Sequence, residues 1–239
     1  MPTLSARNTR VRELMDDPGC DRAVLERTYA QFPLVNGAFA GWKHTYRTYI
    51  RTGFTGPTHS LIDIGSGGGD LARALVRWAA RDGVSLRVSA LDPDPRAQEY
   101  ARRQPRTSPA ISWRTAHSSD LVAAGERADF VVSNHVLHHL TGREREALWQ
   151  DSEALARIRV VHSDIARSSA AYLGFFLATS PLALPGIARS TFIRRDGLTS
   201  IRRSLTPGEL ARELPPGWRV GTQAPARVLA LWEPRRGRG

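Results

Sequence analysis

The chain has 239 residues, of which 41% are hydrophobic and 24% are charged. These proportions are those of a globular protein, so they exclude a disordered or collagen-like chain, and the length predicts one compact domain with an added segment. The formal net charge is +11. Almost all the basic residues are arginines spread along the chain, apart from a short RRGRG end. Charge alone therefore does not predict a nucleic-acid partner.

Cys20 is the only cysteine, which excludes disulfides and thiolate metal clusters within the chain. The first residues contain no apolar run typical of a signal peptide. The most apolar stretch, residues 170–187, is interrupted by Gly174, Pro181, Pro185 and Gly186. We therefore expect a cytoplasmic protein without a transmembrane segment.

Residues 21–51 carry apolar and aromatic side chains at helical spacing, and a Gly- and Pro-containing linker follows at 52–58. This pattern predicts a helical cap over residues 1–56 and a second unit over residues 57–239.

In the second unit, short apolar runs alternate with helical patterns, which predicts parallel strands joined by crossover helices on both faces of a sheet. The alternation lapses at about residues 165–205, where apolar and aromatic residues predict a lid or pocket wall. A helix is expected to start at Thr206, because a hydroxyl residue, a proline and a glutamate follow the order of a capping box. The expected strands cover residues 61–64, 84–91, 111–115, 130–133, 158–162, 218–220 and 228–232.

The segment LIDIGSGGGD, residues 61–70, predicts a strand, a tight glycine loop and the start of a helix. Gly65 and Gly67 allow a sharp turn and let a ligand lie against the main chain. Asp63 and Asp70 flank the loop, and their carboxylates favour a cationic ligand over a pyrophosphate. The loop therefore predicts a cofactor platform.

Asp92 ends the second expected strand, where its carboxylate can accept hydrogen bonds from ribose hydroxyls. A Rossmann dehydrogenase would need the spacing G-x-G-x-x-G, whereas the glycines here follow the order Gly65, Gly67 and Gly69. Hydride transfer is therefore the weaker hypothesis.

The order D-x-G-x-G-x-G followed by Asp92 resembles the class I S-adenosylmethionine-dependent methyltransferases. The segment DFVVSNHVLHHL, residues 129–140, is similar to their fourth-strand motif, especially in quinone-biosynthesis and small-molecule methyltransferases. The resemblance implies a Rossmann-like α/β fold, with a seven-stranded, mostly parallel sheet whose last strand is antiparallel. It also implies S-adenosylmethionine as the cofactor, lying across the ends of the first, second and fourth strands.

The resemblance further implies a set of cofactor-binding residues on the ends of the first four strands. Family members often carry an acid near the adenine at the end of the third strand, but this chain has Ala116 and His117 there. The implied set is Asp63, Gly65, Gly67, Gly69, Asp92, Pro93, Ala116, His117 and Asn134.

A histidine near the transferred methyl group can act as a general base when the nucleophile is a hydroxyl. His138 is the first candidate and His162, beside Asp164, is the second. His138 can instead serve only to pack or cap the turn, and His162 can instead be a histidine that hydrogen-bonds to the backbone at a strand end. His135, His138 and His139 are close enough in sequence to share a metal ion, but without a nearby cysteine or well-placed carboxylate we expect none.

The leading hypothesis is methyl transfer to an oxygen or carbon of a small apolar metabolite, aromatic or polyketide-like, with no specific nucleic-acid partner. An RNA methyltransferase and a non-catalytic cofactor-binding protein remain as alternatives. Against the first, the residues after the fourth strand lack the paired prolines and aromatic residue that grip a flipped base. The sequence leaves the oligomeric state open.

Overall fold

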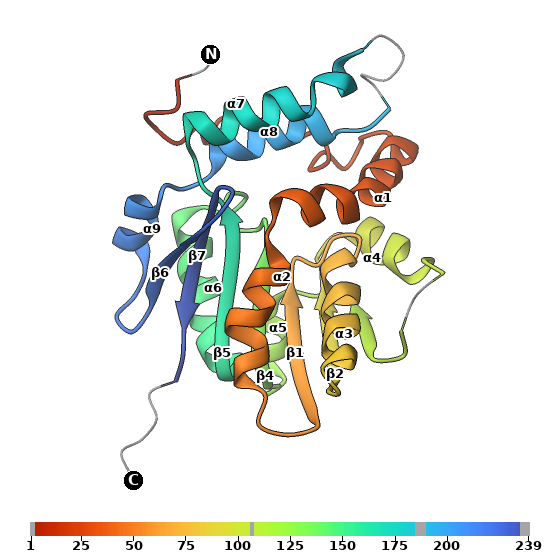
Figure 1. Cartoon of the computed structure of the whole chain (residues 1–239), viewed down its shortest axis with the longest axis vertical. Coiled ribbons are helices and arrows are strands. Elements are labelled where there is room, and N and C mark those ends of the chain that lie inside the picture. Colours follow the sequence, from red (N-terminus) through yellow and green to blue (C-terminus); the bar gives the residue numbers. More distant parts are fainter. Residues whose placement is uncertain (1–2, 106–107, 185–189, 235–239) are drawn as a thin grey trace.

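The computed structural model describes residues 3–105, 108–184 and 190–234. Its centre is a seven-stranded sheet in the order β3-β2-β1-β4-β5-β7-β6 (Figure 1). Only β7 runs antiparallel to its neighbours β5 and β6, which confirms the expected fold class. The strands are β1 (Thr58–Ile64), β2 (Ser85–Leu91), β3 (Ile111–Arg114), β4 (Ala128–Asn134), β5 (Ala156–Ile165), β6 (Arg219–Gln223) and β7 (Arg227–Trp232).

The alternation of side chains along each strand divides the core between the two faces of the sheet. Leu61 of β1 and Phe130 of β4 face one layer, while their neighbours Ile62 and Val131 face the other. The first layer contains α2 (Trp42–Thr45), the π-helical turn η1 (Tyr46–Ile50), the 3-10 turn η2 (Arg51–Gly53) and α3 (Asp70–Arg81). The second contains α5 (Ser118–Ala123), α6 (Gly142–Leu155) and α9 (Pro207–Glu213).

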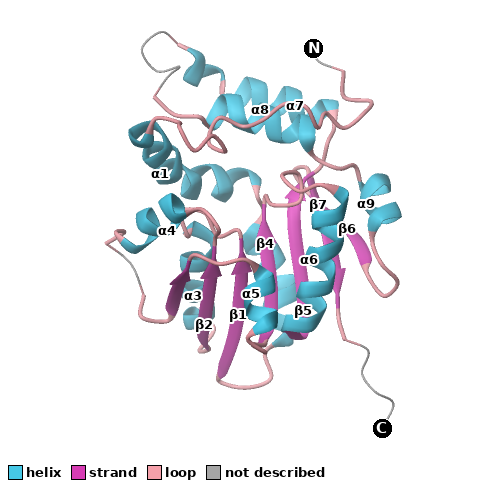
Figure 2. Cartoon of the chain, turned by 180° about the vertical axis from the view of Figure 1, so that it is seen from behind, coloured by secondary structure: helices cyan, strands magenta, loops and turns pink. Residues whose placement is uncertain are grey.

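A third group of helices lies beyond the carboxyl ends of the parallel strands (Figures 1 and 2). Buried Phe175 and Ile193 pack against Phe32 and Val35 of the first helix, so segments far apart in the sequence form one apolar layer. The layer consists of α1 (Arg22–Phe39), α7 (Ser169–Ala178), the 3-10 turn η3 (Ser180–Ala183) and α8 (Ile193–Arg203), with α4 (Pro95–Arg102) below α1. The expected cap and the expected insertion thus meet over the strand ends.

Residues 42–53 take a different place from α1, although the sequence grouped them in one cap. Trp42, Tyr46 and Ile50 are buried against the sheet with Leu61 and Phe130. Their aromatic spacing therefore belongs to the core of the sheet rather than to a cap. The short helix α5 is an addition that the sequence pattern did not indicate.

Within the described ranges, no helix has the length and apolar character needed to cross a membrane. Pro185, Gly186 and the basic RRGRG end lie outside the residues that the structure describes.

Candidate cofactor and substrate site

A cavity of about 490 Å³ lies between the carboxyl ends of the strands and the layer of α1, α7 and α8. Its size falls in the range of small-molecule sites. The polar end is lined by Asp63, Gly65, Ser66, Gly67, Asp70, Asp92, Pro93 and Asn134. The structure thus brings Asp63, Gly65, Gly67, Asp92, Pro93 and Asn134 together at one cavity, as the sequence predicted.

The glycine loop joins β1 to α3, and two of its glycines have different reasons to be there. Gly67 has φ +51°, and a Cβ atom on it would project into open space, so its main chain is bare toward the cavity. Gly69 has φ +75°, but a Cβ there would lie 2.2 Å from the Trp113 ring. Gly69 does not line the cavity, so its role is close packing rather than the predicted cofactor contact.

The carboxylates of Asp63, Asp70 and Asp92 converge on this end of the cavity. Burial, reinforced by the charges of Asp70 and Asp92, raises the pKa of Asp63 well above its ordinary value. The Oδ2 atom of Asp63 has no hydrogen-bond partner among the described residues. An unpartnered buried carboxylate is costly, so the site is incomplete without a donor or a cation from a ligand.

Asp92 is already bonded to the main chain of the loop. Its Oδ2 accepts the Gly67 N–H over 2.7 Å, and its Oδ1 accepts the Asp94 N–H over 2.9 Å. Burial raises the pKa of Asp92 even though these two N–H groups stabilise its charged form. Asn36 of α1 donates to Asp70 over 2.9 Å, which fastens the helical layer to the loop.

The next residues along the cavity, Asn134 and His135, are held by a buried arginine. Arg227 of β7 donates to Asn134 Oδ1 over 2.8 Å, to Ser163 Oγ over 2.9 Å and to His135 Nε2 over 3.0 Å. Burial and the Arg227 charge lower the pKa of His135 well below its ordinary value, so the ring is neutral. The shorter contact of Arg227 with the ring is at Nε2, 3.0 Å against 3.5 Å at Nδ1, so a neutral ring that accepts there carries its proton on Nδ1, which lies 3.7 Å from Asp164 Oδ1. In that tautomer His135 offers a donor rather than a base.

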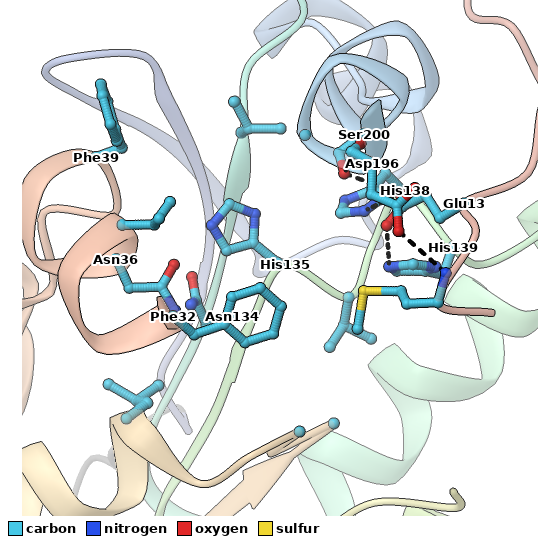
Figure 3. Close-up of a pocket in the computed structure, with 18 of the residues that line it drawn as sticks. Glu13, Phe32, Asn36, Phe39, Asn134, His135, His138, His139, Asp196 and Ser200 are labelled. Carbon is cyan, nitrogen blue, oxygen red and sulfur yellow. Dashed lines mark hydrogen bonds and ion pairs between the residues drawn. The ribbon is translucent and has the colours of Figure 1, made fainter. Parts of the chain in front are cut away.

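His135 also has φ +60°, which is unusual for a residue other than glycine. Figure 3 shows its ring between the aromatic residues of α1 on one side and the cluster around His138 on the other. Strained backbone of this kind gathers at functional sites. Sequence reasoning gave His135 no role in cofactor or substrate binding, because neither its backbone angle nor the approach of Arg227 can be read from the motif.

His138 lines the cavity as predicted, but its surroundings oppose the predicted role as a base. Its Nδ1 lies 2.8 Å from Asp164 Oδ1, and its Nε2 lies 3.1 Å from Glu13 Oε1. Burial alone would lower the pKa of His138, yet the carboxylates of Asp164 and Glu13 outweigh it and raise the pKa to about 10. A ring that holds both protons at neutral pH cannot accept another.

The prediction for His162 as a second base is corrected by the structure. The expected strand ended at His162, but β5 continues to Ile165, so His162 lies inside the sheet and does not line the cavity. Ser133 Oγ and Ser152 Oγ lie 2.8 and 3.0 Å from its two nitrogens, and Trp218 stacks on the ring. Burial lowers the pKa of His162 to about 3, so it is a neutral core residue.

Ala116 and His117 also lie elsewhere than predicted. Ala116 packs against the core on the α6 side, and His117 is the exposed N-cap residue of α5. Neither lines the cavity. The chain turns into α5 directly after β3, which carries both residues away.

The far end of the cavity is apolar and belongs to the helical layer. Phe32, Val35 and Phe39 of α1 line it together with Phe175 of α7 and Ile193 of α8, and the Phe39 and Phe175 rings contact each other edge to face. Glu13, Asn36 and Asp196 join the lining from segments that no sequence motif marked. They are brought to the site only by the fold.

Comparison with known proteins agrees with this geometry. Residues 61–159 match the sequence model of the family described as a methyltransferase domain. Residues 61–159 form a methyltransferase domain. A ubiquinone biosynthesis O-methyltransferase from Methylobacterium sp. (strain 4-46) is 37% identical over 82 residues. That match covers 34% of this chain and 30% of the relative, so the chain matches less than a third of that protein's length.

Solved structures resemble the chain over most of its length, at sequence identities that show the fold alone. The plantazolicin methyltransferase BpumL, in complex with a triazolic desmethylPZN analog and SAH, is 12% identical with a TM-score of 0.61. The match covers 91% of this chain and 95% of that one. An O-methyltransferase family protein from Burkholderia thailandensis is 13% identical with a TM-score of 0.59, covering 87% and 59% of the two chains.

The resemblance in sequence implied S-adenosylmethionine as the cofactor, and the structure of BpumL, which has a similar fold, was solved with SAH. The residues present fit S-adenosylmethionine, because the ligand carries an ammonium and a sulfonium while the loop supplies an unpartnered carboxylate at Asp63. Asp92 is placed to accept ribose hydroxyls, and Gly67 leaves room for close approach of the ligand.

Proposed function

We propose that the protein transfers a methyl group from S-adenosylmethionine to an oxygen, or a carbon, of a small apolar metabolite of aromatic or polyketide-like character. The proposal rests on the division of the cavity into an acidic end and an apolar end. Its acidic, glycine-lined end suits the charged cofactor, and the facing end has walls of Phe32, Phe39 and Phe175. Apolar walls with a few polar groups favour a flat hydrophobic substrate.

Methyl transfer from a sulfonium is a direct displacement, in which the nucleophile must lie in line with the methyl and sulfur atoms. Of the three histidines among the described cavity residues, His135 and His138 both lack a free imidazole lone pair in the protonation states given above, and the two nitrogens of His139 lie 3.2 Å from Asp16 and 3.8 Å from Glu13. The nucleophile we propose is therefore acidic on its own, such as a phenol or an enol. The Nδ1–H of His135 and the apolar walls would hold it in line and exclude water.

The experiment uses the full chain with methyl-labelled S-adenosylmethionine and a panel of phenolic, enolic and aliphatic hydroxyl compounds of similar size. We expect label in the phenolic or enolic products, identified by mass spectrometry, and little in the aliphatic alcohols. Label incorporated only into RNA added as a competitor, or no turnover despite measured cofactor binding, would contradict the proposal.

A further inference from the structure

A cluster of two histidines and a glutamate lies at the edge of the cavity, outside the cofactor end. Glu13, His138 and His139 line the cavity, and one carboxylate oxygen and the two ring nitrogens lie within 4.8 Å of one another. We propose that these three residues bind a divalent transition-metal ion of the zinc class. The proposal does not depend on the proposed methyl transfer.

The distances among the ligand atoms suit such an ion. Bonds of 2.0–2.1 Å to a tetrahedral zinc separate its ligand atoms by roughly 3.4 Å. Here His138 Nε2 is 3.1 Å from Glu13 Oε1, and His139 Nε2 is 3.8 Å from Glu13 Oε2. Small side-chain shifts would bring all three onto one ion.

The Nε2 atom of His138 is the observation that points to a ligand. The His138 side chain is 1% exposed, and although Glu13 is near, Nε2 makes no aligned hydrogen bond among the described residues. A buried ring nitrogen 3.1 Å from a carboxylate oxygen and beside a second imidazole, ion-paired but not aligned for a hydrogen bond, is placed as a metal ligand is before the ion binds.

Both histidines are also oriented as metal-ligating histidines are. In such sites the nitrogen opposite the metal usually donates to a carboxylate, which fixes the ring. His138 Nδ1 lies 2.8 Å from Asp164 Oδ1, and His139 Nδ1 lies 3.2 Å from Asp16 Oδ2. Each Nε2 is thereby left for the ion.

The third ligand is held in place by the helical layer. Ser200 of α8 donates to Glu13 Oε1 over 2.9 Å, and Asp196 accepts the Leu14 and Met15 N–H groups over 2.8 and 3.0 Å. Glu13, Asp16 and Asp164 bring negative charge to the pair of histidines. Arg203, 3.5 Å from Asp16, offsets part of that charge. The same charge that would hold a proton on His138 would hold a divalent cation.

A neighbouring set, His135, His138 Nδ1 and Asp164, is less suited to a metal. His138 Nδ1 is already hydrogen-bonded to Asp164, and the guanidinium of Arg227 lies against His135. We therefore place the ion on the Nε2 side. Three protein ligands leave a fourth position of a tetrahedral site open, and since all three line the cavity, an anionic oxygen bound there can fill it.

The test uses untagged full-length protein, freed of metal with a chelator and titrated calorimetrically with zinc chloride. Cobalt chloride serves as a second probe, because its visible spectrum reports tetrahedral coordination. We expect one zinc ion per chain and an intense cobalt spectrum. The variants Glu13→Gln and His139→Gln should each weaken zinc binding at least about tenfold, and Asp16→Asn by about 10- to 100-fold.

His117→Gln is the matched control, since His117 is exposed on α5 and should leave binding unchanged. Circular dichroism would verify folding. If the variant at buried Glu13 fails to fold, zinc binding by the variant at partly exposed His139 tests the proposal. The proposal is overturned if the wild type binds no stoichiometric zinc. It is equally overturned if a folded His139→Gln variant binds zinc, and gives the cobalt spectrum, as the wild type does.

Discussion

The carboxylate of Asp92 accepts the backbone N–H of Gly67 over 2.7 Å. This bond ties the end of β2 to the turn of the glycine loop, so the acid expected to bind the ribose and the loop expected to carry the cofactor are positioned by one contact. Because the bond needs no ligand, the cofactor end of the cavity is organised in advance of binding.

Alanine substitutions at Gly67 and Gly69 should separate cofactor binding from stability. At Gly67 the left-handed backbone costs about 1 kcal/mol, and the new methyl group enters the cavity, so cofactor affinity falls with little loss of stability. At Gly69 the methyl group meets Trp113, so we expect a loss of about 3 kcal/mol of stability. Urea unfolding and cofactor titration of both variants measure the two effects. Equal losses of stability would count against these assignments.

Asp63→Asn should stabilise the ligand-free protein while weakening cofactor binding about tenfold or more. Because burial raises the pKa of Asp63, its contribution to the free energy of unfolding falls as the pH rises above the value of about 3.9 for the unfolded chain, and the loss is complete above the raised value. The gain in melting temperature should therefore be largest near neutral pH and vanish in acid, where both side chains are uncharged. A variant that melts lower than the wild type at neutral pH would show that Asp63 has a partner in solution.

The buried His162 predicts a loss of stability in mild acid. Burial lowers its pKa to about 3, whereas the unfolded chain takes up the proton near 6.5. Between these two values the unfolded state binds more protons, so the free energy of unfolding falls by about 1.4 kcal/mol for each pH unit below 6.5.

His162→Gln should remove this contribution, because glutamine does not titrate. The variant is expected to be less stable at neutral pH but to lose less stability on acidification. Chemical unfolding of both proteins between pH 7 and 4.5 measures the difference. Parallel pH profiles would mean that His162 is not shielded from protons.

His135→Asn should slow turnover without disturbing the fold or the cofactor. Asparagine tolerates the left-handed backbone at this position but cannot reach as far into the cavity. We expect kcat/KM for the methyl acceptor to fall about tenfold, the effect of losing one hydrogen bond at the reacting group, with cofactor affinity unchanged. If kcat/KM stays at the wild-type value, His135 does not position the substrate.

Sequence periodicity was sufficient to predict where the strands lie and that most of them pair in parallel, whereas the seven-stranded sheet with one antiparallel strand was implied by the family resemblance. Periodicity failed for α5, a six-residue helix with only Leu121 buried. It also failed for His162, since a strand end is set by pairing with β7, which extends β5 to Ile165. Strand boundaries decide which side chains reach an active site.

The cofactor end could be predicted because its residues stand at motif positions at the ends of three strands: the glycine loop after β1, Asp92 and Pro93 after β2, and Asn134 at the end of β4. The rest of the site could not, because its parts come from distant segments. Glu13 and Asn36 reach the cavity from the N-terminal region, and Arg227 reaches it from the last strand. The pairing of His138 with two carboxylates, which changes its chemistry from base to cation, depends on those long-range contacts.

Calorimetric titration of the wild type and of Asp92→Ala with S-adenosylmethionine measures the central claim most directly. Asp92 joins the loop to the ribose site, so the account predicts saturable binding of one cofactor per chain in the wild type and its severe loss in a folded Asp92→Ala variant. No heat with the wild type at millimolar cofactor, or equal affinity of the two proteins, would contradict it.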